Sequence, residues 1–205
     1  MFVRTGYFTG DPARLGRALD GLSAEAVGLL SAEPGYRGFG LFANRELGII
    51  TMGSWWESAQ AERDSDAKLG GRRAELVAPF AGTVAVDVWE AAAFAPPREG
   101  GPGAGFRLVR AEFDPAAADR LVGIFREQAL PALERMDGFV GGALLIQRDR
   151  GRGSVGAIFS DRAALAASRG PQAEARAKVT AAAGVTVRSV EEFEVVVLDR
   201  RPPQG

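Results

Sequence analysis

The 205-residue sequence predicts an α+β protein built from two similar units, each about 95 residues long. The first observation is a constant spacing, because features of the first half recur 103 residues later in the second half. The second is the hydrophobic pattern, which predicts the same order of strands and helices in both halves. The third is a segment rich in proline and glycine, 95–105, with the composition of a flexible linker. We therefore expect a first repeat at 1–94 and a second at 106–200.

The constant spacing starts at two predicted helix N-termini. Asp11-Pro12 and Asp114-Pro115 each place an aspartate at the N-cap and a proline at the first helical position. The same spacing carries Pro34-Gly35-Tyr36-Arg37-Gly38 onto Asp137-Gly138-Phe139-Val140-Gly141, and Ser65 onto Ser168. One spacing that holds without a gap over this length indicates a tandem duplication.

The first half of each unit is predicted to run from a strand into a helix and then into a pair of strands. The first strands are expected at 2–8 and 106–113, and apolar residues at helical spacing follow them. These helices end near Pro34-Gly35 and Asp137-Gly138. In the first unit the strand pair is expected at 39–43 and 48–56. The turns between the paired strands are Asn44-Arg45-Glu46-Leu47 in the first unit and Arg148-Asp149-Arg150-Gly151 in the second.

Each unit is predicted to end with a second helix and a closing strand. In the first unit the glycine pair Gly70-Gly71 predicts a break in this helix, and in the second unit Gly170-Pro171 predicts an interruption. The expected second helices are 57–80 and 161–183, and the expected closing strands are 83–94 and 185–198.

The resulting order, β-α-β-β-α-β, is the ferredoxin-like arrangement. It places both helices on one face of an antiparallel sheet, so the other face needs a partner if it is apolar. We expect the two repeats to pack sheet to sheet, as an intramolecular pseudo-dimer with a closed α+β barrel and a cavity between the sheets. The sequence leaves a further homodimer open.

Two residue types are absent. The chain has no cysteine, which excludes disulfides, thiolate nucleophiles and Cys-ligated metals, and it has no histidine. A Ser-His-Asp mechanism is therefore impossible within this chain, and the usual base near neutral pH is missing. We expect no metal and no cofactor. The net charge of −1 predicts neither nucleic-acid nor membrane binding, and without a long apolar stretch we expect a cytoplasmic location.

Several short motifs resemble a known family. Pro34-Gly35-Tyr36-Arg37-Gly38, Asn44-Arg45-Glu46-Leu47-Gly48, Trp56-Glu57-Ser58 and Ser65 resemble the antibiotic biosynthesis monooxygenase family, in the dimeric α+β barrel superfamily. The second repeat keeps the 137–141 motif and Ser168 but has Phe159 where Trp56 stands. The resemblance implies a range of activities: cofactor-independent oxygenases of quinols and polyketides, haem-degrading enzymes, isomerases, cyclases and proteins without a known reaction. Haem degraders of this type use a histidine ligand, which this chain lacks.

Candidate substrate-binding residues lie on strands of the first repeat. Trp55 shares a strand face with Thr51 and Gly53. A large aromatic residue beside small and polar ones is compatible with the wall of a cavity and equally with a purely structural role. On the closing strand the valines Val84, Val86 and Val88 are expected to face the helices, which places Asp87 and Trp89 on the opposite face. Asn44 is a further candidate, although a turn role explains it without a ligand.

Candidate catalytic residues are the polar side chains on these faces. Asp87 is either a base, a ligand contact or, in the interpretation we favour, half of an ion pair with Arg4 or Arg110. Glu112 lies two residues from Arg110 and so on the same face. Tyr7 is the better placed of the two tyrosines. All Trp and Tyr residues lie in the first repeat, which favours that half as the site of any pocket.

The leading functional hypothesis is a cofactor-independent monooxygenase acting on an electron-rich aromatic molecule such as a quinol or a polyketide. Arg4 or Arg110 would stabilise a substrate anion, and Asp87, Glu112 or Tyr7 would move its proton. The first alternative is a non-catalytic protein that binds a small molecule or a partner, and the second is an isomerase or cyclase on the same scaffold. The polarity of the cavity discriminates between the enzyme and the binding protein.

Overall fold

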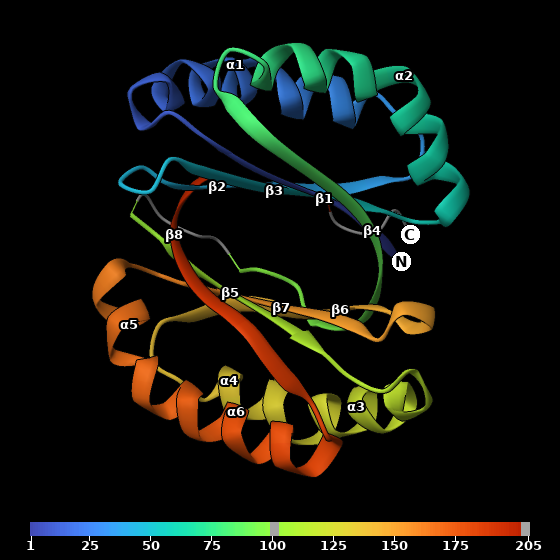
Figure 1. Cartoon of the computed structure of the whole chain (residues 1–205), viewed down its shortest axis with the longest axis vertical. Helices are drawn as coiled ribbons and strands as arrows, with labels where there is room; N and C mark the ends of the chain where they lie inside the picture. Colours follow the sequence, from blue (N-terminus) through green and yellow to red (C-terminus); the bar gives the residue numbers. More distant parts are fainter. Residues whose placement is uncertain (99–102, 202–205) are drawn as a thin grey trace. The chain divides into compact units, whose positions relative to one another are not determined.

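A computed structural model describes residues 1–98 and 103–201, and these divide into two compact units (Figure 1). Unit 1 consists of Met1–Trp89 and Val195–Gly205, and unit 2 consists of Glu90–Glu194. Part of the predicted linker at 95–105, residues 99–102, lies outside the described residues. The predicted repeat boundaries stay predictions.

Eight antiparallel strands have the hydrogen-bonding order of a closed barrel, β1-β3-β2-β8-β5-β7-β6-β4. The strands are β1 (Phe2–Gly10), β2 (Tyr36–Asn44), β3 (Ile49–Trp56), β4 (Ala81–Ala95), β5 (Gly105–Glu112), β6 (Phe139–Gln147), β7 (Arg152–Phe159) and β8 (Thr186–Arg200). The two closing strands, β4 and β8, have 15 residues each and contribute to both units. The predicted α+β class is confirmed, whereas the sheet-to-sheet packing of two repeats stays a prediction.

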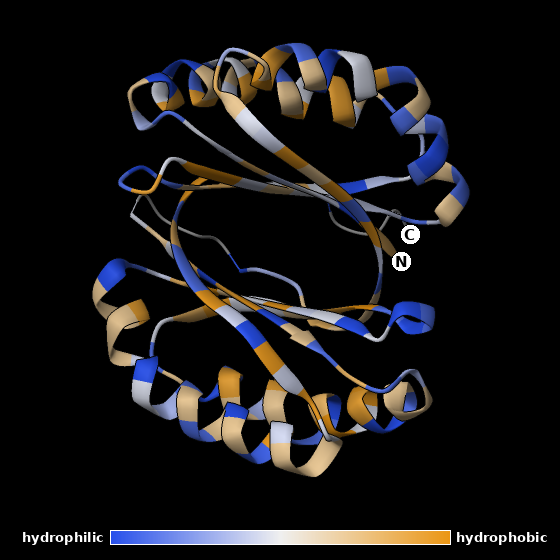
Figure 2. Cartoon of the chain, in the orientation of Figure 1, coloured by the Kyte–Doolittle hydropathy of each residue, from blue (hydrophilic) through white to orange (hydrophobic). Residues whose placement is uncertain are grey.

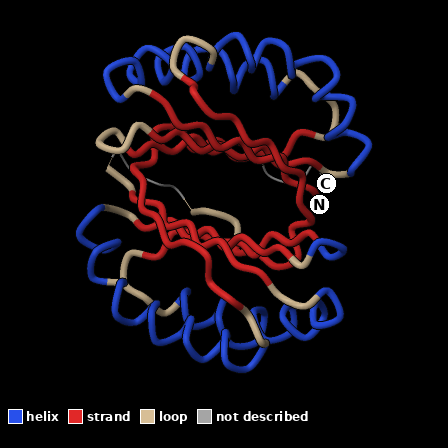
Figure 3. Tube along the Cα trace, viewed as in Figure 1, coloured by secondary structure: helices blue, strands red, loops and turns tan. Residues whose placement is uncertain are grey.

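Unit 1 has two helices on one face of its strands (Figures 1 and 3). Helix α1 (Pro12–Ser31) begins where predicted, and the side chain of Asp11 accepts a hydrogen bond from the backbone N–H of Ala13 at 2.9 Å. Apolar residues of α1 pack against the strands, and Trp56 at the end of β3 is fully buried among them. Figure 2 shows apolar and polar residues alternating along the helices, as this one-sided packing requires.

The second helix of unit 1, α2 (Ala59–Val77), runs without interruption, so the predicted break at Gly70-Gly71 is wrong. Neither glycine has a positive φ. Glycine costs about 1 kcal/mol relative to alanine inside a helix, and tertiary contacts outweigh that cost. One such contact is the two-pronged pair between Arg72 and Glu25 of α1, at 2.8 and 3.0 Å.

In unit 2 each of the two predicted helices consists of several shorter helical segments. The first consists of a 3-10 turn η1 (Pro115–Ala117), α3 (Ala118–Ile124), a π-helical turn η2 (Phe125–Ala129) and α4 (Leu130–Glu134). Pro131 explains the π turn, because its ring would collide with the carbonyl group four residues earlier in a regular helix. The second is interrupted at Ser168 between α5 (Arg162–Ala167) and α6 (Arg169–Ala183), close to the predicted position.

The predicted hairpin turns are confirmed. In unit 1 the side chain of Asn44 accepts a hydrogen bond from the backbone N–H of Leu47 at 2.9 Å, which is the turn role expected for asparagine. In unit 2 a 3-10 turn η3 (Arg148–Arg150) leads into Gly151, whose φ of 59° lies in the left-handed region. A side chain at this glycine would also meet the carbonyl oxygen of Phe113, so both conformation and space require glycine there.

Candidate functional site

Most of the sequence-predicted binding residues of unit 1 lie on the sheet face that points away from its helices. The register pairs Tyr7 with Thr51 and Val3 with Trp55, and alternation puts these side chains on one face. The indole Nε1 of Trp89 donates to the hydroxyl of Thr5 on the same face, at 2.7 Å. We call this the aromatic face; it consists of Thr5, Tyr7, Thr51, Trp55, Asp87 and Trp89.

Several polar atoms of the aromatic face already have partners within unit 1. The hydroxyl of Thr51 donates to the carbonyl oxygen of Gly6 at 3.1 Å, and that of Thr5 donates to the carbonyl oxygen of Asp87 at 3.5 Å. Val84, Val86 and Val88 lie on the other side of β4 and are exposed by 40 to 60%. The helices therefore cover this side of the strand only in part.

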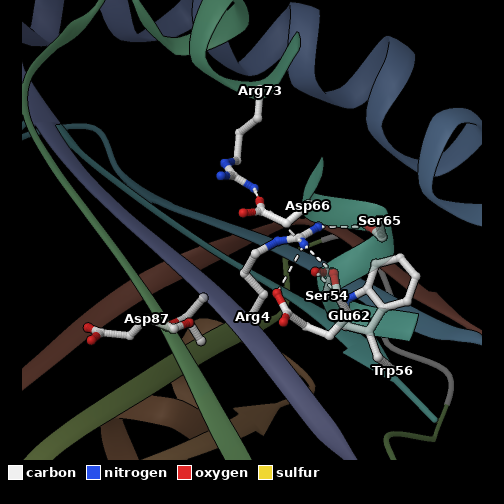
Figure 4. A network of polar contacts seen from close by, with 9 residues as sticks. Arg4, Ser54, Trp56, Glu62, Ser65, Asp66, Arg73 and Asp87 are labelled. Atoms are coloured by element: carbon white, nitrogen blue, oxygen red, sulfur yellow. Dashed lines mark hydrogen bonds and ion pairs between the residues drawn. The ribbon is translucent and has the colours of Figure 1, made fainter. Parts of the chain in front are cut away.

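Arg4 lies on the opposite face, beneath the helices, and its side chain is 5% exposed. Its guanidinium donates to the carbonyl oxygen and to the carboxylate of Glu62, each at 3.1 Å, and to the hydroxyl of Ser65 at 3.0 Å (Figure 4). It also lies over the ring of Trp56, 5.5 Å from its centroid. Figure 4 shows the carboxylate of Asp87 pointing away from this network, so the expected Arg4–Asp87 pair does not form.

A second arginine completes the cluster around Arg4. Arg73 pairs with Asp66 at 2.8 Å, and Asp66 lies 3.4 Å from Arg4. Burial lowers the pKa of Arg4, and repulsion by Arg73 lowers it further, while Asp66 and Glu62 oppose both effects. Two guanidinium groups thus face two carboxylates. Arg4 therefore fastens β1 to α2, and its charge is already compensated without a ligand.

Unit 2 repeats this arrangement around Arg107, which the sequence analysis did not single out. Its guanidinium donates to the hydroxyl of Ser168 at 2.9 Å, to the carbonyl oxygen of Leu165 at 2.7 Å and to Glu192 at 2.6 Å. Arg107 stands 103 residues after Arg4, and Ser168 stands 103 residues after Ser65. The constant spacing was the signal that would have identified it.

The remaining candidates of unit 2 are engaged in ion pairs with β8. Arg110 donates to Glu191 at 2.9 Å, and Glu112 pairs with Arg188. These contacts join neighbouring strands, because Arg110 lies opposite Ser189 and Glu112 opposite Thr186 in the register. Such partly exposed pairs contribute about 0–1 kcal/mol to stability.

Each unit contains a cavity between its sheet and its helices, a location that the sequence analysis did not anticipate. The cavity of unit 1 has a volume of about 50 Å³, and that of unit 2 about 90 Å³. Nine lining positions correspond at the spacing of 103 residues: Gly6 and Val109, Leu22 and Phe125, Ala26 and Ala129, Leu30 and Leu133, Met52 and Val155, Leu69 and Gln172, Arg72 and Ala175, Arg73 and Arg176, and Leu76 and Val179.

Residue size explains why the cavity of unit 2 is larger. Ala111 and Gly153 line it. The corresponding positions of unit 1 are filled by Phe8 and Ile50, which are 1% and 0% exposed. The π turn also contributes, since Phe125 and Ala129 at its two ends lie in the cavity wall. Turns of this type are frequent at functional sites.

The two cavities differ in polarity as well as in size. Gln172 lines the cavity of unit 2, is 6% exposed and has a side-chain Nε2 without a hydrogen-bond partner. Leu69 takes the corresponding place in unit 1. Arg176 also lines the cavity of unit 2, and across the described chain its guanidinium forms no hydrogen bond or ion pair. Burial lowers the pKa of Arg176, and repulsion by Arg107 lowers it further.

One substitution between the units explains the unpaired Arg176. Its counterpart Arg73 is neutralised by Asp66, but the position that corresponds to Asp66 is Arg169. Arg169 pairs with Glu192 instead, at 2.6 Å. The cavity of unit 2 therefore offers an amide N–H and a cation to a ligand. Its described lining includes no carboxylate and no phenol, so it offers no side chain that accepts a proton near neutral pH.

In the described part of the chain no group of three or more acidic side chains is placed to hold a metal ion. None of the helices there is both long and apolar enough to cross a membrane.

Two α+β units, each with helices over one sheet face and a cavity beneath them, define a ferredoxin-fold protein with the strand order of an α+β barrel. Solved structures share this fold. A candidate monooxygenase from Lactobacillus acidophilus has a TM-score of 0.73 and 13% identity, with 97% of this chain and 95% of that one covered. An anthrone oxidase-like protein has a TM-score of 0.64 and 15% identity, with 96% and 92% covered.

Comparison of sequences finds relatives in Mycobacterium tuberculosis. Two uncharacterised proteins of that organism are each 28% identical to this chain, over 168 and 175 residues. The matches cover 82% and 85% of this chain, and 71% and 78% of the relatives. No protein-family model matches the sequence.

Proposed function

We propose that this protein binds a small organic molecule in the helix–sheet cavity of unit 2. The observation that carries the proposal is the buried amide nitrogen of Gln172, which has no hydrogen-bond partner and belongs to a residue that lines a mainly apolar cavity. A buried polar atom without a partner costs about 1–3 kcal/mol, so a site that tolerates one gains from a ligand that supplies the partner. Small-molecule sites commonly combine apolar walls with a few such polar groups.

The internal comparison between the units supports this site. The corresponding cavity of unit 1 is smaller, has Leu69 in place of the glutamine, and has ion-pair partners for each of its arginines. The distribution of Trp and Tyr residues along the sequence favours the first half, whereas cavity size and polarity favour unit 2. This comparison also supports the hypothesis of a duplication followed by divergence.

A fragment screen read by methyl NMR tests the proposal. Small aromatic and aliphatic fragments are expected to shift the methyl signals of Val155 and Val179, which line the cavity of unit 2. The matched internal control is the pair of signals from Met52 and Leu76 at the corresponding positions of unit 1. Shifts confined to unit 1, or no saturable shift at Val155 and Val179 with any fragment, contradict the proposal.

A second candidate function is cofactor-independent oxygenation of an electron-rich aromatic molecule at the aromatic face of unit 1. The observation that favours it is the grouping of Tyr7, Trp55 and Trp89 with Asp87 on one side of the sheet. An anthrone oxidase-like protein shares the fold. In such a reaction the CH₂ group of an anthrone loses one proton to a base and a carbanion forms. The carbanion adds O₂, and loss of water from the resulting peroxide leaves a C=O group.

Oxygen consumption distinguishes this candidate from simple binding. The substrate supplies all the electrons, since one oxygen atom enters the product and the other leaves in water. An oxygen electrode with anthrone as substrate is expected to show turnover that falls at least tenfold in Asp87→Asn. Tyr7→Phe tests the only phenol of this face in the same way. Saturable binding of anthrone without oxygen uptake rules out the oxygenase and leaves the binding function.

A further inference from the structure

The amide of Gln172 and the guanidinium of Arg176 are placed to meet one ligand group together. The two residues are four positions apart on α6, so their side chains lie on the same side of the helix. Both line the cavity of unit 2. The amide nitrogen of Gln172 and the guanidinium of Arg176 both donate hydrogen bonds and accept none, so what these two groups can share is an acceptor.

The charge of this pair is not balanced by the protein. Arg176 has no ion-pair partner in the described structure, and the neighbouring Arg107 adds to the positive potential. Burial lowers the pKa of Arg176, and repulsion by Arg107 lowers it further. Arg107 itself is paired with Glu192, and so is Arg169. A partly buried cation without a counter-ion is costly, which makes an anionic acceptor more favourable than a neutral one.

The rest of the wall determines the body of the ligand. It is built mainly from aliphatic side chains and one ring, including Val109, Leu121, Phe125, Leu144 and Val179. Thr180 also lines it, and its hydroxyl donates to the carbonyl oxygen of Ala177 at 3.0 Å. A cavity of about 90 Å³ is smaller than the roughly 150 Å³ of an engineered apolar cavity that binds benzene, so it accommodates a short alkyl chain as it stands and a single ring once its walls move apart. These walls offer no charged group that would compete for the acceptor.

We propose that the ligand of the unit-2 cavity is a compact apolar molecule with one anionic oxygen group, a carboxylate, phenolate or enolate, which accepts hydrogen bonds from Gln172 Nε2 and from Arg176. This inference rests on the proposed function, because it specifies the chemical class of ligand for the same site. The corresponding cavity of unit 1 lacks both features, since it has Leu69 and an Arg73 already neutralised by Asp66.

Three probes of similar size separate the contributions of the apolar body, of a neutral acceptor and of a charged acceptor to the binding free energy. Ethylbenzene has the apolar body alone, methyl phenylacetate adds a neutral acceptor, and phenylacetate adds a charged one. The dissociation constants, measured by titration of the Val155 and Val179 methyl signals, are expected to fall in that order. Charged acceptors bind donors more strongly than neutral acceptors do, and we expect phenylacetate to bind about tenfold more tightly than the ester.

Two variants test the two donors. Arg176→Met keeps the apolar stem and is expected to weaken phenylacetate about tenfold while changing ethylbenzene binding less than twofold. Gln172→Leu introduces the residue that unit 1 has at this place, so we expect it to fold. It should raise the melting temperature, since it removes a buried unpaired polar group, and weaken both acceptor-bearing probes severalfold.

The matched control is Lys178→Met, which removes an exposed positive charge from the same helix and is expected to change none of the three dissociation constants by more than twofold. If phenylacetate and ethylbenzene bind the wild type equally well, or if Arg176→Met binds phenylacetate as the wild type does, the anionic ligand is overturned and the binding function stands. If neither these probes nor any fragment of the screen shifts Val155 or Val179, the proposed function itself is overturned.

Discussion

Arg107 donates a hydrogen bond to Ser168 across 2.9 Å, and their separation of 61 positions in the sequence is also that of Arg4 and Ser65, which are 3.0 Å apart. The equality extends to a second contact. Each arginine donates to a backbone carbonyl oxygen 58 residues further along, that of Glu62 in unit 1 and that of Leu165 in unit 2. These matching contacts support the duplication hypothesis. They also show that a buried arginine fastens the first strand to the second helix in both units.

Replacing these arginines is expected to destabilise unit 1 more than unit 2. Arg4→Met leaves the carboxylate of Glu62, 4% exposed, without its ion-pair partner, and we expect a loss of about 3–5 kcal/mol. Arg107→Met leaves Glu192 paired with Arg169, so a loss of about 1–3 kcal/mol is expected. Urea unfolding of both variants gives the two values. Equal losses, or a larger loss for Arg107→Met, would show that the orphaned carboxylate is not the main cost.

Much of this fold was predictable from local signals in the sequence. Asp11-Pro12 marks a helix start through capping geometry, and Asn44 marks a turn through its own side chain. The misjudged elements depend on contacts distant in sequence. The helix across Gly70-Gly71 is continuous because α1 packs against it, and the π turn arises from a single proline within an otherwise regular helical pattern.

The continuity of α2 leads to a prediction about its glycines. A Cβ at Gly71 would meet nothing within 4 Å, so Gly71→Ala is expected to stabilise the protein by about 0.5–1 kcal/mol. A Cβ at Gly70 would lie 3.3 Å from the carboxylate of Asp66, so Gly70→Ala should gain less. The difference in free energy of unfolding between the two variants is the measurement. A loss of stability in Gly71→Ala would contradict a regular helix at this position.

Glu192 predicts a specific loss of stability in acid. Hydrogen bonds from Arg169, and next those from Arg107, lower the pKa of Glu192 below its ordinary value of 4.5. A carboxyl group whose pKa is lower in the folded state stabilises the fold above its unfolded pKa, and this contribution is lost as the pH falls through the folded pKa. The urea midpoint of Glu192→Gln should therefore be lower than that of the wild type at pH 7, and the gap should narrow by pH 3.

A nearby carboxylate provides the control for this prediction. Glu174 is exposed on α6, the helix that begins at Arg169, and has no ion pair in the described structure, so Glu174→Gln is expected to follow the wild type at both pH values. A gap of the same size at pH 7 and pH 3 for Glu192→Gln would show that its hydrogen bonds, and not its charge, account for its contribution.

The candidate site was harder to predict than the fold. Alternation along the strands identified residues that do share a face, such as Tyr7 and Thr51. The same alternation did not predict the cavity of unit 2. Small residues such as Ala111 and Gly153 indicate a cavity only when they are compared with Phe8 and Ile50, the residues at the corresponding positions of unit 1. A cavity arises from the absence of bulk at positions brought together by folding, and no local pattern reports it.

Filling the cavity of unit 2 should separate ligand binding from stability. Gly153 lies in β7, and a Cβ there would have its nearest neighbour, Phe113, at 3.6 Å, which leaves room for a side chain. Gly153→Val occupies part of the cavity with a residue that favours strands, so we expect the free energy of unfolding to rise by about 1 kcal/mol while phenylacetate binding weakens at least tenfold.

Gly123→Ala is the control, because a Cβ there meets nothing within 4 Å and Gly123 does not line the cavity. It should stabilise the protein similarly without affecting binding. If Gly153→Val binds phenylacetate as the wild type does, the ligand does not enter this cavity; if both variants lose binding, the effect comes from rigidity of the fold rather than from the filled space.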